Sequence, residues 1–406
     1  MLVYLHLMKK KVVIGLSGGV DSSVAAWVLK EQGYDVTGLF MKNWHDTTGV
    51  LEGDCTYEDD IMFAEMVAEK IGIPFLSVDL SGPYKRRVVD YMFSEYEAGR
   101  TPNPDILCNR EIKFDSFVKE AHNMGIKLVA TGHYCRKETV FVNRRMIHRL
   151  LAGEDPKKDQ SYFLCQVTQD QLAGAVFPIG NMTKAEVREL AAQLKLPTAT
   201  RKDSQGICFI GKVDLPTFLQ QQLKPRTGRT VIIPAGWDFP AYGRGLPEDG
   251  ISDERLGEMS CPYTYNPGCG LTIGKHNGAH YFTVGQRKGI NIGGYKEPLF
   301  VLSVDSNNNI IYVGEGQNHP GLHRKGLLVK EEDIHWIRPD MSMKKGEIRE
   351  YDVRIRYRQA LEKAKLYRRE GGMYIIFDKL QRGIAPGQFA AWYAGDELLG
   401  SGVISS

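Results

Sequence analysis

The first half of the chain alternates unbroken apolar runs with segments of helical period. The apolar runs are typical of strands buried on both faces and occupy Lys11–Leu16, Tyr34–Lys42, Ile73–Leu80 and Lys127–Thr131. Helical periodicity fills the intervals at Asp21–Gln32, Glu58–Lys70, Tyr84–Tyr96 and Glu111–Met124. This alternation predicts a parallel sheet with helices on both faces and ligands at the carboxyl ends of its strands.

The second half has a different pattern. A capping box at Thr183–Glu186 opens one further helix, and helical periodicity ends near Lys224. Short β-rich runs separated by turns follow at Leu299–Val304, Ile310–Val313, Tyr351–Tyr357, Met373–Phe377 and Gln388–Tyr393, which indicates a small β barrel or sandwich. Because 406 residues exceed what one core supports, we expect three domains, at 8–222, 223–298 and 299–406.

Composition narrows the class of protein. The 52 basic and 49 acidic side chains give a net charge of +3, which excludes nucleic-acid binding by bulk charge and leaves room for a local basic patch. No apolar run is long enough for a membrane span. The seven cysteines are odd in number and include no Cys-x-x-Cys pair, so we do not expect a disulfide scaffold. We expect a reducing, cytoplasmic location instead.

A glycine-rich loop, Ser17–Ser23, joins the first predicted strand to the first helix. Gly18 and Gly19 let the backbone turn its N–H groups inward, and the helix N-terminus adds partial positive charge. The loop lacks the lysine of a Walker loop, and Asp21 can hold Mg²⁺ at a pyrophosphate. We therefore predict a polyphosphate site here. The alternative is a tight turn capped by an aspartate.

Two cysteines stand in polar, basic surroundings. Cys108 precedes the helix predicted to begin at Glu111, where the helix N-terminus and Arg110 would both lower a thiol pKa. Cys208 follows 100 residues later in a similar context. The alternative for any free cysteine is a small buried hydrophobe, and we expect that for Cys135 and Cys165.

Several motifs carry a family resemblance. Ser17–Ser22 resembles the PP-loop of the ATP pyrophosphatases. Longer motifs, which together resemble the tRNA-specific 2-thiouridylases, occupy Thr101–Asn109, Ala130–Tyr134, Lys158–Leu164, Lys202–Ile210, Phe282–Gly289 and Val353–Arg358. The resemblance implies a PP-loop (adenine nucleotide alpha hydrolase-like) α/β domain with a helical tRNA-binding extension, a small central domain and a C-terminal β-barrel.

The resemblance also implies a reaction. ATP adenylates O2 of the wobble uridine of a tRNA anticodon, and a cysteine persulfide then delivers sulfur to C2, giving 2-thiouridine, AMP and pyrophosphate. Cys208 would carry the persulfide. Cys108 would assist sulfide release, or attack the S–S bond and leave a Cys108–Cys208 disulfide for a reductant to open. Asp21, Cys108 and Cys208 are thus the predicted catalytic residues.

The resemblance also assigns binding residues, each at the position of this sequence that matches a family motif. The predicted ATP pocket consists of Gly15, Leu16, Ser17, Gly18, Gly19, Val20, Asp21, Ser22, Met41 and Gly132. Asn103, Pro104 and Asp105 would meet the target base, although a proline-rich Asx turn is also consistent with them. Predicted tRNA contacts are His133, Lys158, Asp159, Gln160, Arg356, Tyr357 and Gln388. The alternatives are a structural role for His133 and a solvated strand face for the arginines around Tyr357.

The expected partners are tRNA, ATP, Mg²⁺ and a persulfide donor, which is either a cysteine desulfurase or a sulfur-relay protein. We expect the protein itself to be a monomer. Two other readings stay open. A PP-loop amide ligase for a small metabolite would need no cysteine pair, and a non-catalytic tRNA-binding protein would need neither the pair nor Asp21.

One stretch, Ala235–Gly278, departs from the family pattern. It is rich in Gly and Pro, and we expect an irregular surface insertion. Cys261 and Cys269, with His276 and His280 after them, offer zinc ligation as an alternative, but their spacing is unlike that of common zinc modules.

Overall fold

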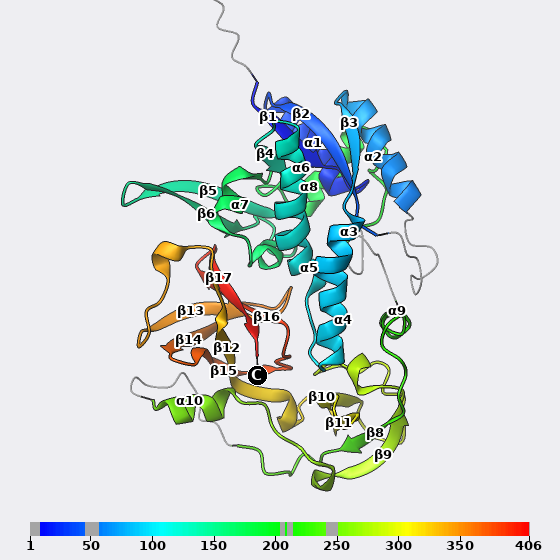
Figure 1. Cartoon of the computed structure of the whole chain (residues 1–406), viewed down its shortest axis with the longest axis vertical. Coiled ribbons are helices and arrows are strands. Elements are labelled where there is room, and N and C mark those ends of the chain that lie inside the picture. Colours follow the sequence, from blue (N-terminus) through cyan, green and yellow to red (C-terminus); the bar gives the residue numbers. More distant parts are fainter. Residues whose placement is uncertain (1–8, 45–56, 204–207, 209–213, 241–250, 406) are drawn as a thin grey trace, which may run out of the picture. The chain divides into compact units, whose positions relative to one another are not determined.

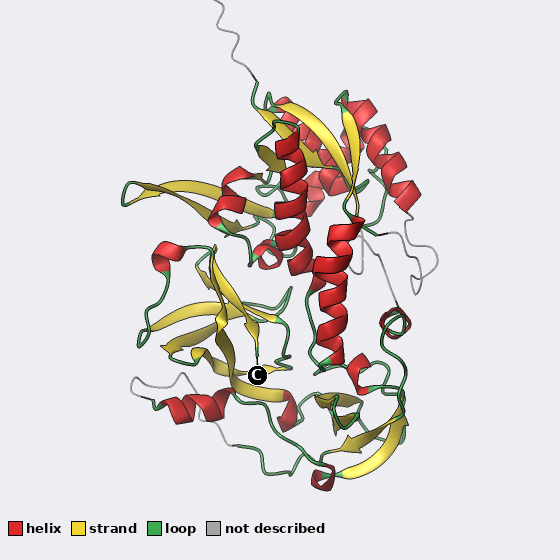
Figure 2. Ribbon diagram, in the orientation of Figure 1, coloured by secondary structure: helices red, strands yellow, loops and turns green. Residues whose placement is uncertain are grey.

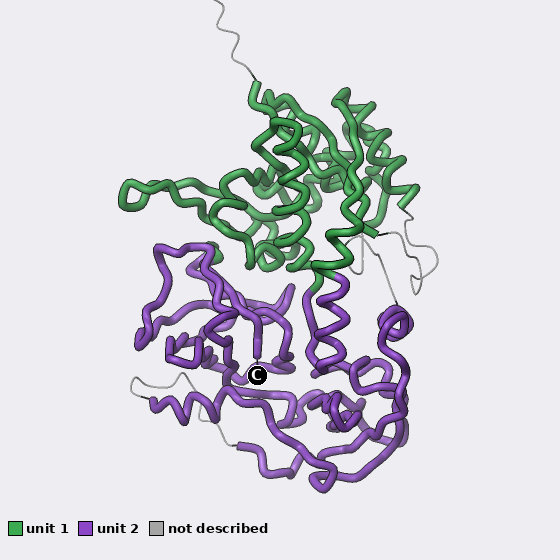
Figure 3. The backbone as a smooth tube through the Cα atoms, viewed as in Figure 1, with its two compact units in different colours: residues 1–88, 104–213, 396–398 green, residues 89–103, 214–395, 399–406 purple. Residues whose placement is uncertain are grey.

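The computed structural model describes residues 9–44, 57–203, 208, 214–240 and 251–405. The chain divides into two compact units, which are described separately (Figure 3). Unit 1 comprises Met1–Val88, Pro104–Val213 and Asp396–Leu398, and unit 2 comprises Val89–Asn103, Asp214–Gly395 and Leu399–Ser406. No helix in the described ranges has the length and apolar character needed to cross a bilayer.

Unit 1 holds the predicted strand–helix alternation (Figure 1). Its strands are β1 (Lys11–Gly15), β2 (Asp35–Lys42), β3 (Phe75–Asp79), β4 (Leu128–Ala130), β5 (Cys135–Val142), β6 (Arg145–Ala152) and β7 (Ala175–Val176). Its helical segments are α1 (Val20–Glu31), α2 (Tyr57–Ile71), α3 (Ser81–Tyr84), α5 (Pro104–Leu107), η2 (Cys108–Ser116), α6 (Phe117–Asn123), η3 (Ser161–Leu164), α7 (Gln169–Gly174) and α8 (Lys184–Gln193); η1 (Lys85–Val89) leads out of it.

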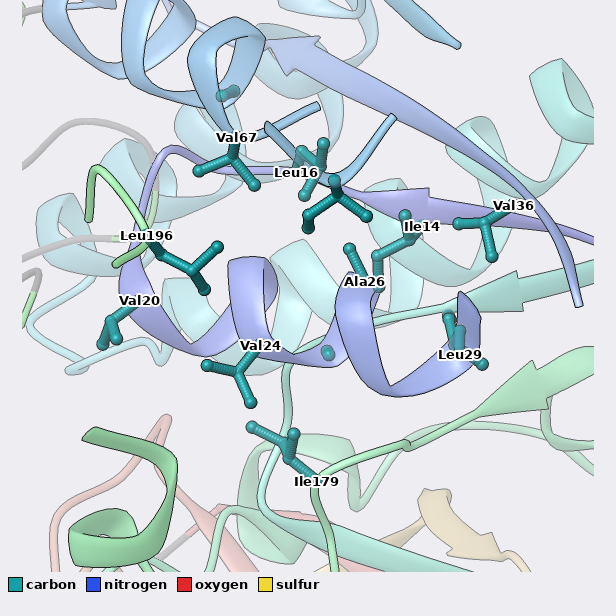
Figure 4. Close-up of a cluster of buried hydrophobic side chains, with 14 of the residues drawn as sticks. Ile14, Leu16, Val20, Val24, Ala26, Leu29, Val36, Val67, Ile179 and Leu196 are labelled. Atoms are coloured by element: carbon teal, nitrogen blue, oxygen red, sulfur yellow. The ribbon is translucent and has the colours of Figure 1, made fainter. Parts of the chain in front are cut away.

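The sheet of unit 1 is parallel, in the order β3-β2-β1-β4-β7. The four predicted strands and the parallel sheet are confirmed. The two-residue β7 was not predicted because it is too short to show a pattern. Alternate residues of β1 face opposite layers. Ile14 belongs to a buried cluster with residues of α1 and α2 (Figure 4) and of α8, while Gly15 faces Met41 and Phe117.

The helix predicted at Glu111 begins seven residues earlier, at Pro104, and runs as α5, η2 and α6 to Asn123. Its middle part, η2, has the i→i+5 hydrogen bonding of a π-helix. Such wide turns are rare and are found at functional sites. Cys108 therefore lies inside a helix rather than before one.

Unit 2 contains the β-rich half (Figure 2). Its helical segments are α4 (Asp90–Glu97), α9 (Leu215–Leu219), α10 (Asp253–Ser260), η4 (Pro267–Cys269), η5 (Ala279–Tyr281), η6 (Pro320–Leu322) and η7 (Pro339–Met341). Its strands are β8 (Gly228–Ile232), β9 (Leu271–His276), β10 (Leu299–Asp305), β11 (Ile310–Glu315), β12 (His323–Trp336), β13 (Ile348–Arg354), β14 (Glu362–Arg369), β15 (Gly372–Arg382), β16 (Phe389–Ala394) and β17 (Glu397–Ile404).

The predicted β-barrel is confirmed in this unit. Its strands follow the order β12-β15-β14-β13-β16-β17, and a further β12–β17 pairing closes the ring. The first two β-rich runs of the sequence, β10 and β11, are not part of it. They form a separate four-stranded sheet with β8 and β9, in the order β10-β11-β8-β9.

The stretch Ala235–Gly278 is not the irregular surface insertion we expected. Among its described residues it contains α10 and β9, and Leu256 and Met259 of α10 are buried against Tyr367 and Ile376 of the barrel strands. Eight residues are too few for helical periodicity to stand out between glycine-rich segments.

The zinc alternative for this stretch finds no support. Both ring nitrogens of His276 are in hydrogen bonds, to the Arg229 carbonyl and from the Gly278 N–H, each at 3.1 Å. Within the described part of the chain, no group of three or more potential ligands is arranged to hold a metal.

Candidate active site

The predicted phosphate loop connects β1 to α1 and is held in shape by its own serines. The Ser22 hydroxyl accepts a hydrogen bond from the Ser17 N–H at 3.2 Å and donates to the Gly19 carbonyl at 3.1 Å. Gly18 has a φ of +71°, and a Cβ there would meet the backbone of Asp60. Leu16 and Val20 are buried on either side of the loop. The N–H groups of the first turn of α1 are thus presented at a rigid loop, as an anion site needs.

Three further predicted ATP residues lie at this loop or at the strand that leads to it. A Cβ on Gly132 would come within 2.8 Å of the Ser22 backbone nitrogen, so only glycine allows this close approach. A Cβ on Gly15 would lie 3.3 Å from the end of the Met41 side chain. The structure therefore brings together Gly15, Met41, Gly132 and the loop, which sequence separation alone would not indicate.

Asp21 belongs to a charged network at the start of α1. Its carboxylate accepts hydrogen bonds from the Tyr134 hydroxyl and from Lys184 Nζ, both at 2.7 Å. Lys184 also pairs with Asp203 at 2.7 Å. Burial opposes ionisation of Asp203, but hydrogen bonds from Lys158 and Lys184 keep its pKa well below the usual range. The Lys184 ammonium, paired with the carboxylates of Asp21 and Asp203, thus lies beside the proposed anion site.

The Arg201 side chain contacts both the phosphate loop and helix α2. Its guanidinium donates to the Gly18 carbonyl at 2.6 Å, pairs with Asp60 at 2.9 Å and lies over the Phe63 ring at 4.3 Å. Burial raises the pKa of Asp60, and Arg201 opposes that rise.

We expect Arg201→Met to destabilise the protein by about 2 kcal/mol near neutral pH, because it leaves the Asp60 carboxylate and the Gly18 carbonyl without this partner. Loss of the cation raises the pKa of Asp60 further, so the deficit shrinks as pH falls through that pKa and Asp60 becomes neutral. Urea unfolding between pH 4 and pH 8 measures this loss in the free energy of unfolding. Lys119→Met, at an exposed lysine, is the control. A deficit that stays constant with pH would contradict the role assigned to Asp60.

Cys108 and Cys208 meet in unit 1, with their sulfur atoms 3.7 Å apart. Cys108 is fully buried in η2, and Cys208 is half-buried. The Cys208 N–H donates to the Asp105 carboxylate at 3.0 Å, and the Tyr84 hydroxyl donates to the Cys208 carbonyl at 2.6 Å. Both cysteines are free thiols. The disulfide named above is therefore absent from this structure, since a bonded pair lies about 2.05 Å apart.

The two thiols have opposite acidities. Burial, together with a hydrogen bond to Cys208, raises the pKa of Cys108 well above that of a free thiol. The hydrogen bond from Cys108 lowers the pKa of Cys208 despite burial, and the ammonium of Lys113 lowers it further. The prediction of an acidic Cys108 is thus wrong. Arg110 is engaged by Glu111 and Gln166 instead, and the helix N-terminus lies at Pro104.

Both polar side chains of the segment predicted to contact the base, Asn103 and Asp105, have hydrogen-bond partners. In unit 2 the Asn103 side chain donates to Gln388 at 3.3 Å, and Gln388 donates to the carbonyls of Thr101 and Pro102, both at 3.0 Å. Two residues predicted separately, Asn103 and Gln388, therefore form one contact. In unit 1, burial raises the pKa of Asp105.

The other predicted tRNA residues differ in how accessible they are. His133 is buried and hydrogen-bonds Thr131 at 2.7 Å, and burial lowers its pKa well below the usual value. Asp159 is buried and accepts two backbone N–H groups, and Gln160 accepts the Tyr134 N–H at 2.9 Å. These placements favour structural roles for His133, Asp159 and Gln160. Lys158 is partly exposed and pairs with Asp203 at 2.7 Å.

Arg356 and Tyr357 lie in the turn after β13 rather than on a strand face. Arg356 is exposed, and its guanidinium donates to the carbonyls of Arg382 and Gly383. Tyr357 is half-buried, with the Arg358 guanidinium 5.2 Å from its ring centroid. An exposed cation beside an aromatic ring suits a nucleic-acid contact.

Sequence reasoning did not single out Lys113, Lys184 or Arg201, although each lies within or directly beside a predicted element or motif. Lys113 lies in the helix predicted from Glu111, Lys184 follows the cap residue Thr183, and Arg201 directly precedes the motif Lys202–Ile210. The one available signal was a basic side chain within a few residues of each predicted site. Which of these basic residues turns inward depends on tertiary structure.

Family models match three parts of the chain. Residues 10–212 match the tRNA methyl transferase HUP domain, residues 264–315 the tRNA methyl transferase PRC-barrel domain, and residues 324–404 the aminomethyltransferase beta-barrel domain. The parallel sheet with its glycine-rich loop is thus a HUP-class, ATP-using domain, followed by a PRC-barrel and a β-barrel.

Curated relatives give the family. The tRNA-specific 2-thiouridylase MnmA of Christiangramia forsetii is 56% identical over 399 residues, covering 98% of this chain and 100% of the relative. That of Flavobacterium johnsoniae is 56% identical over 397 residues, with the same coverage, and that of Bacillus subtilis is 42% identical over 395 residues, covering 97% and 94%. The chain belongs to the family of tRNA-specific 2-thiouridylases, which are tRNA sulfurtransferases.

Proposed function

We propose that this chain uses ATP to activate O2 of the wobble uridine of a tRNA anticodon and then delivers sulfur from a Cys208 persulfide to C2. The observation that carries the proposal is the cysteine pair. Two free thiols, Cys108 and Cys208, have their sulfur atoms 3.7 Å apart in the same unit as a glycine-rich phosphate loop. An amide ligase of the same class would need no such pair.

The activation step uses the loop between β1 and α1. The uridine O2 attacks the α-phosphorus of ATP, and pyrophosphate leaves. The N–H groups of Ser17–Ser22 and the N-terminus of α1 stabilise its charge, and Lys184 adds a cation. Mg²⁺ takes one or two carboxylates together with phosphate oxygens, and Asp21 would supply one. When bound, the ion neutralises charge on the leaving pyrophosphate.

The transfer step uses the two cysteines. The outer sulfur of the Cys208 persulfide attacks C2, and AMP departs with O2. Cys108 then gives up its proton and attacks the Cys208 sulfur, which leaves the outer sulfur on the base and creates a Cys108–Cys208 disulfide. Alternatively, Cys108 attacks first and releases the sulfide that reacts with C2. Either route ends with a disulfide, so a cellular reductant is needed in each cycle.

The remaining partners follow from this chemistry. Asn103 and Asp105 offer amide and carboxylate groups to the uracil edge, and Arg356 and Tyr357 offer a cation and a ring to the tRNA. The sulfur comes from a cysteine desulfurase or a relay protein that carries a persulfide. We expect the chain to act as a monomer in the cytoplasm.

The test is thiolation in vitro. Purified protein, ATP, Mg²⁺, a desulfurase with cysteine and unmodified tRNA are combined, and the nucleosides are analysed by mass spectrometry. We expect one added sulfur, at a single anticodon uridine, with a stoichiometric release of pyrophosphate. Pyrophosphate release with a small metabolite and no sulfur gain would favour the amide ligase instead.

Gln388 gives a prediction for the tRNA side. Gln388→Ala removes three hydrogen bonds that order residues 101–103, and we expect kcat/KM for tRNA to fall about 10-fold. The KM for ATP should not change, because the loop that binds it is made by other residues. Steady-state kinetics with each substrate varied in turn measure this, and Gln193→Ala, on the exposed face of α8, is the control. An equal effect on both substrates would indicate a general loss of structure.

A further inference from the structure

Lys113 lies beside the two cysteines and has no part in the reaction described above. It follows Cys108 by five residues in η2, whose i→i+5 hydrogen bonds place residues five apart on one side of the helix. In an α-helix the same two positions would be about 140° apart. The wide turn therefore places Lys113 on the side of η2 that carries Cys108, whose sulfur lies 3.7 Å from that of Cys208.

The titratable groups that face Cys208 come from three helical segments. Cys108 and Lys113 come from η2, Asp105 from α5 and Tyr84 from α3. Tyr84 is neutral because burial raises its pKa well above the usual value. Asp105 disfavours a negative charge on Cys208, and Lys113 favours one. Burial alone would lower the pKa of Lys113, but the charges of Cys208, Cys108 and Asp105 raise it, so the ammonium stays charged.

We propose that Lys113 is the positioning residue that holds Cys208 as a thiolate, the form that accepts the outer sulfur of a donor persulfide. The proposal rests on the function proposed above for the identity of the donor. It assigns the first step of the cycle, the loading of sulfur, to side chains around Cys208 rather than to tRNA or ATP.

The loading step balances without a further reactant. The Cys208 thiolate attacks the outer sulfur of the donor persulfide R–S–SH. A new S–S bond forms between Cys208 and the outer sulfur, the donor's own S–S bond breaks, and the donor leaves as R–S⁻. The product Cys208–S–SH keeps the proton that was on the outer sulfur. Because only a thiolate attacks at a useful rate, the thiolate fraction of Cys208 sets the rate of loading.

The test measures the acidity of Cys208 directly. The intact protein is alkylated with iodoacetamide between pH 5 and pH 10, and mass spectrometry follows the peptide that contains Cys208. In the natural protein we expect the rate to inflect below about pH 8.5, the value for a free thiol. In Lys113→Met the inflection should rise by at least one pH unit and the rate at pH 7 should fall at least about 10-fold. Lys113→Arg should restore both.

Lys119→Met is the matched control, since Lys119 lies six residues further along the same helix, exposed and paired with Asp115. An unchanged profile in a folded Lys113→Met would overturn the proposal. Should that variant fail to fold, an inflection at or above pH 8.5 in the natural protein would overturn it equally. Alkylation needs neither tRNA nor ATP. A shifted profile without tRNA thiolation would therefore refute the proposed function alone, and thiolation with an unmoved profile would refute this inference alone.

Discussion

Replacing Cys208 by serine is expected to abolish sulfur transfer to tRNA, with a loss of at least about 10³-fold, while tRNA-dependent pyrophosphate release continues. Serine keeps the size of the side chain and the Cys208 backbone contacts to Asp105 and Tyr84, but a hydroxyl cannot carry a persulfide. Activation of the base uses the loop after β1 and does not involve this side chain. Thiolation by mass spectrometry and pyrophosphate release, measured on the same samples, check the result.

The matched control is Cys261→Ser, which removes an exposed cysteine of unit 2. It should thiolate tRNA like the natural protein. If Cys208→Ser retained desulfurase-dependent thiolation and Cys108→Ser did not, the two cysteines would have to exchange roles. Loss of pyrophosphate release in Cys208→Ser would instead mean that the thiol also takes part in activation.

The second large effect is expected on the ATP side. Gly132→Val places a branched side chain where even a Cβ would lie 2.8 Å from the Ser22 nitrogen, so the backbone of the phosphate loop must move. A displacement of about 1 Å costs on the order of 100-fold in such sites, and we expect pyrophosphate release to fall at least that far. The backbone that a Cβ on Gly132 would meet belongs to Asp21 and Ser22, so loading of sulfur on Cys208 from the desulfurase should continue.

Gly257→Val is the control for this substitution, since Gly257 lies in α10 and a Cβ there meets open space. ATP binding measured by calorimetry would separate a binding defect from a chemical one. Normal ATP affinity and normal pyrophosphate release in Gly132→Val would remove the loop after β1 from the reaction.

The sequence predicted those parts of the fold that rest on local pattern. The apolar runs before Gly18 and around Met41 identified the central strands, because strands buried on both faces show unbroken apolar runs. The family resemblance, not the spacing, supplied the pairing of Cys108 with Cys208 across 100 residues. The structure then placed their sulfur atoms in contact.

Electrostatics around the cysteines could not be predicted in the same way. The lowered pKa expected for Cys108 was wrong because the helix begins at Pro104, which buries Cys108 in its interior. The position of Lys113 depends on wide helical turns, and periodicity arguments assume 3.6 residues per turn. The sequence pattern also failed to predict the eight-residue helix α10, because its short apolar face can be recognised only once the barrel strands that it packs against are known.

Because η2 has wide turns, the number of residues between Cys108 and Lys113 determines where the lysine lies relative to the cysteine. Deleting one residue between Cys108 and Lys113 would let the segment relax to α-helical geometry, with the lysine then four positions from the cysteine and everything after it rotated by about 100°. The buried rings of Phe114, which packs against His133 and Phe177, and of Phe117, which packs against Gly15, would lose these contacts. Converting η2 to regular α-helical turns would therefore improve its backbone hydrogen bonding and make Cys208 a poorer sulfur acceptor.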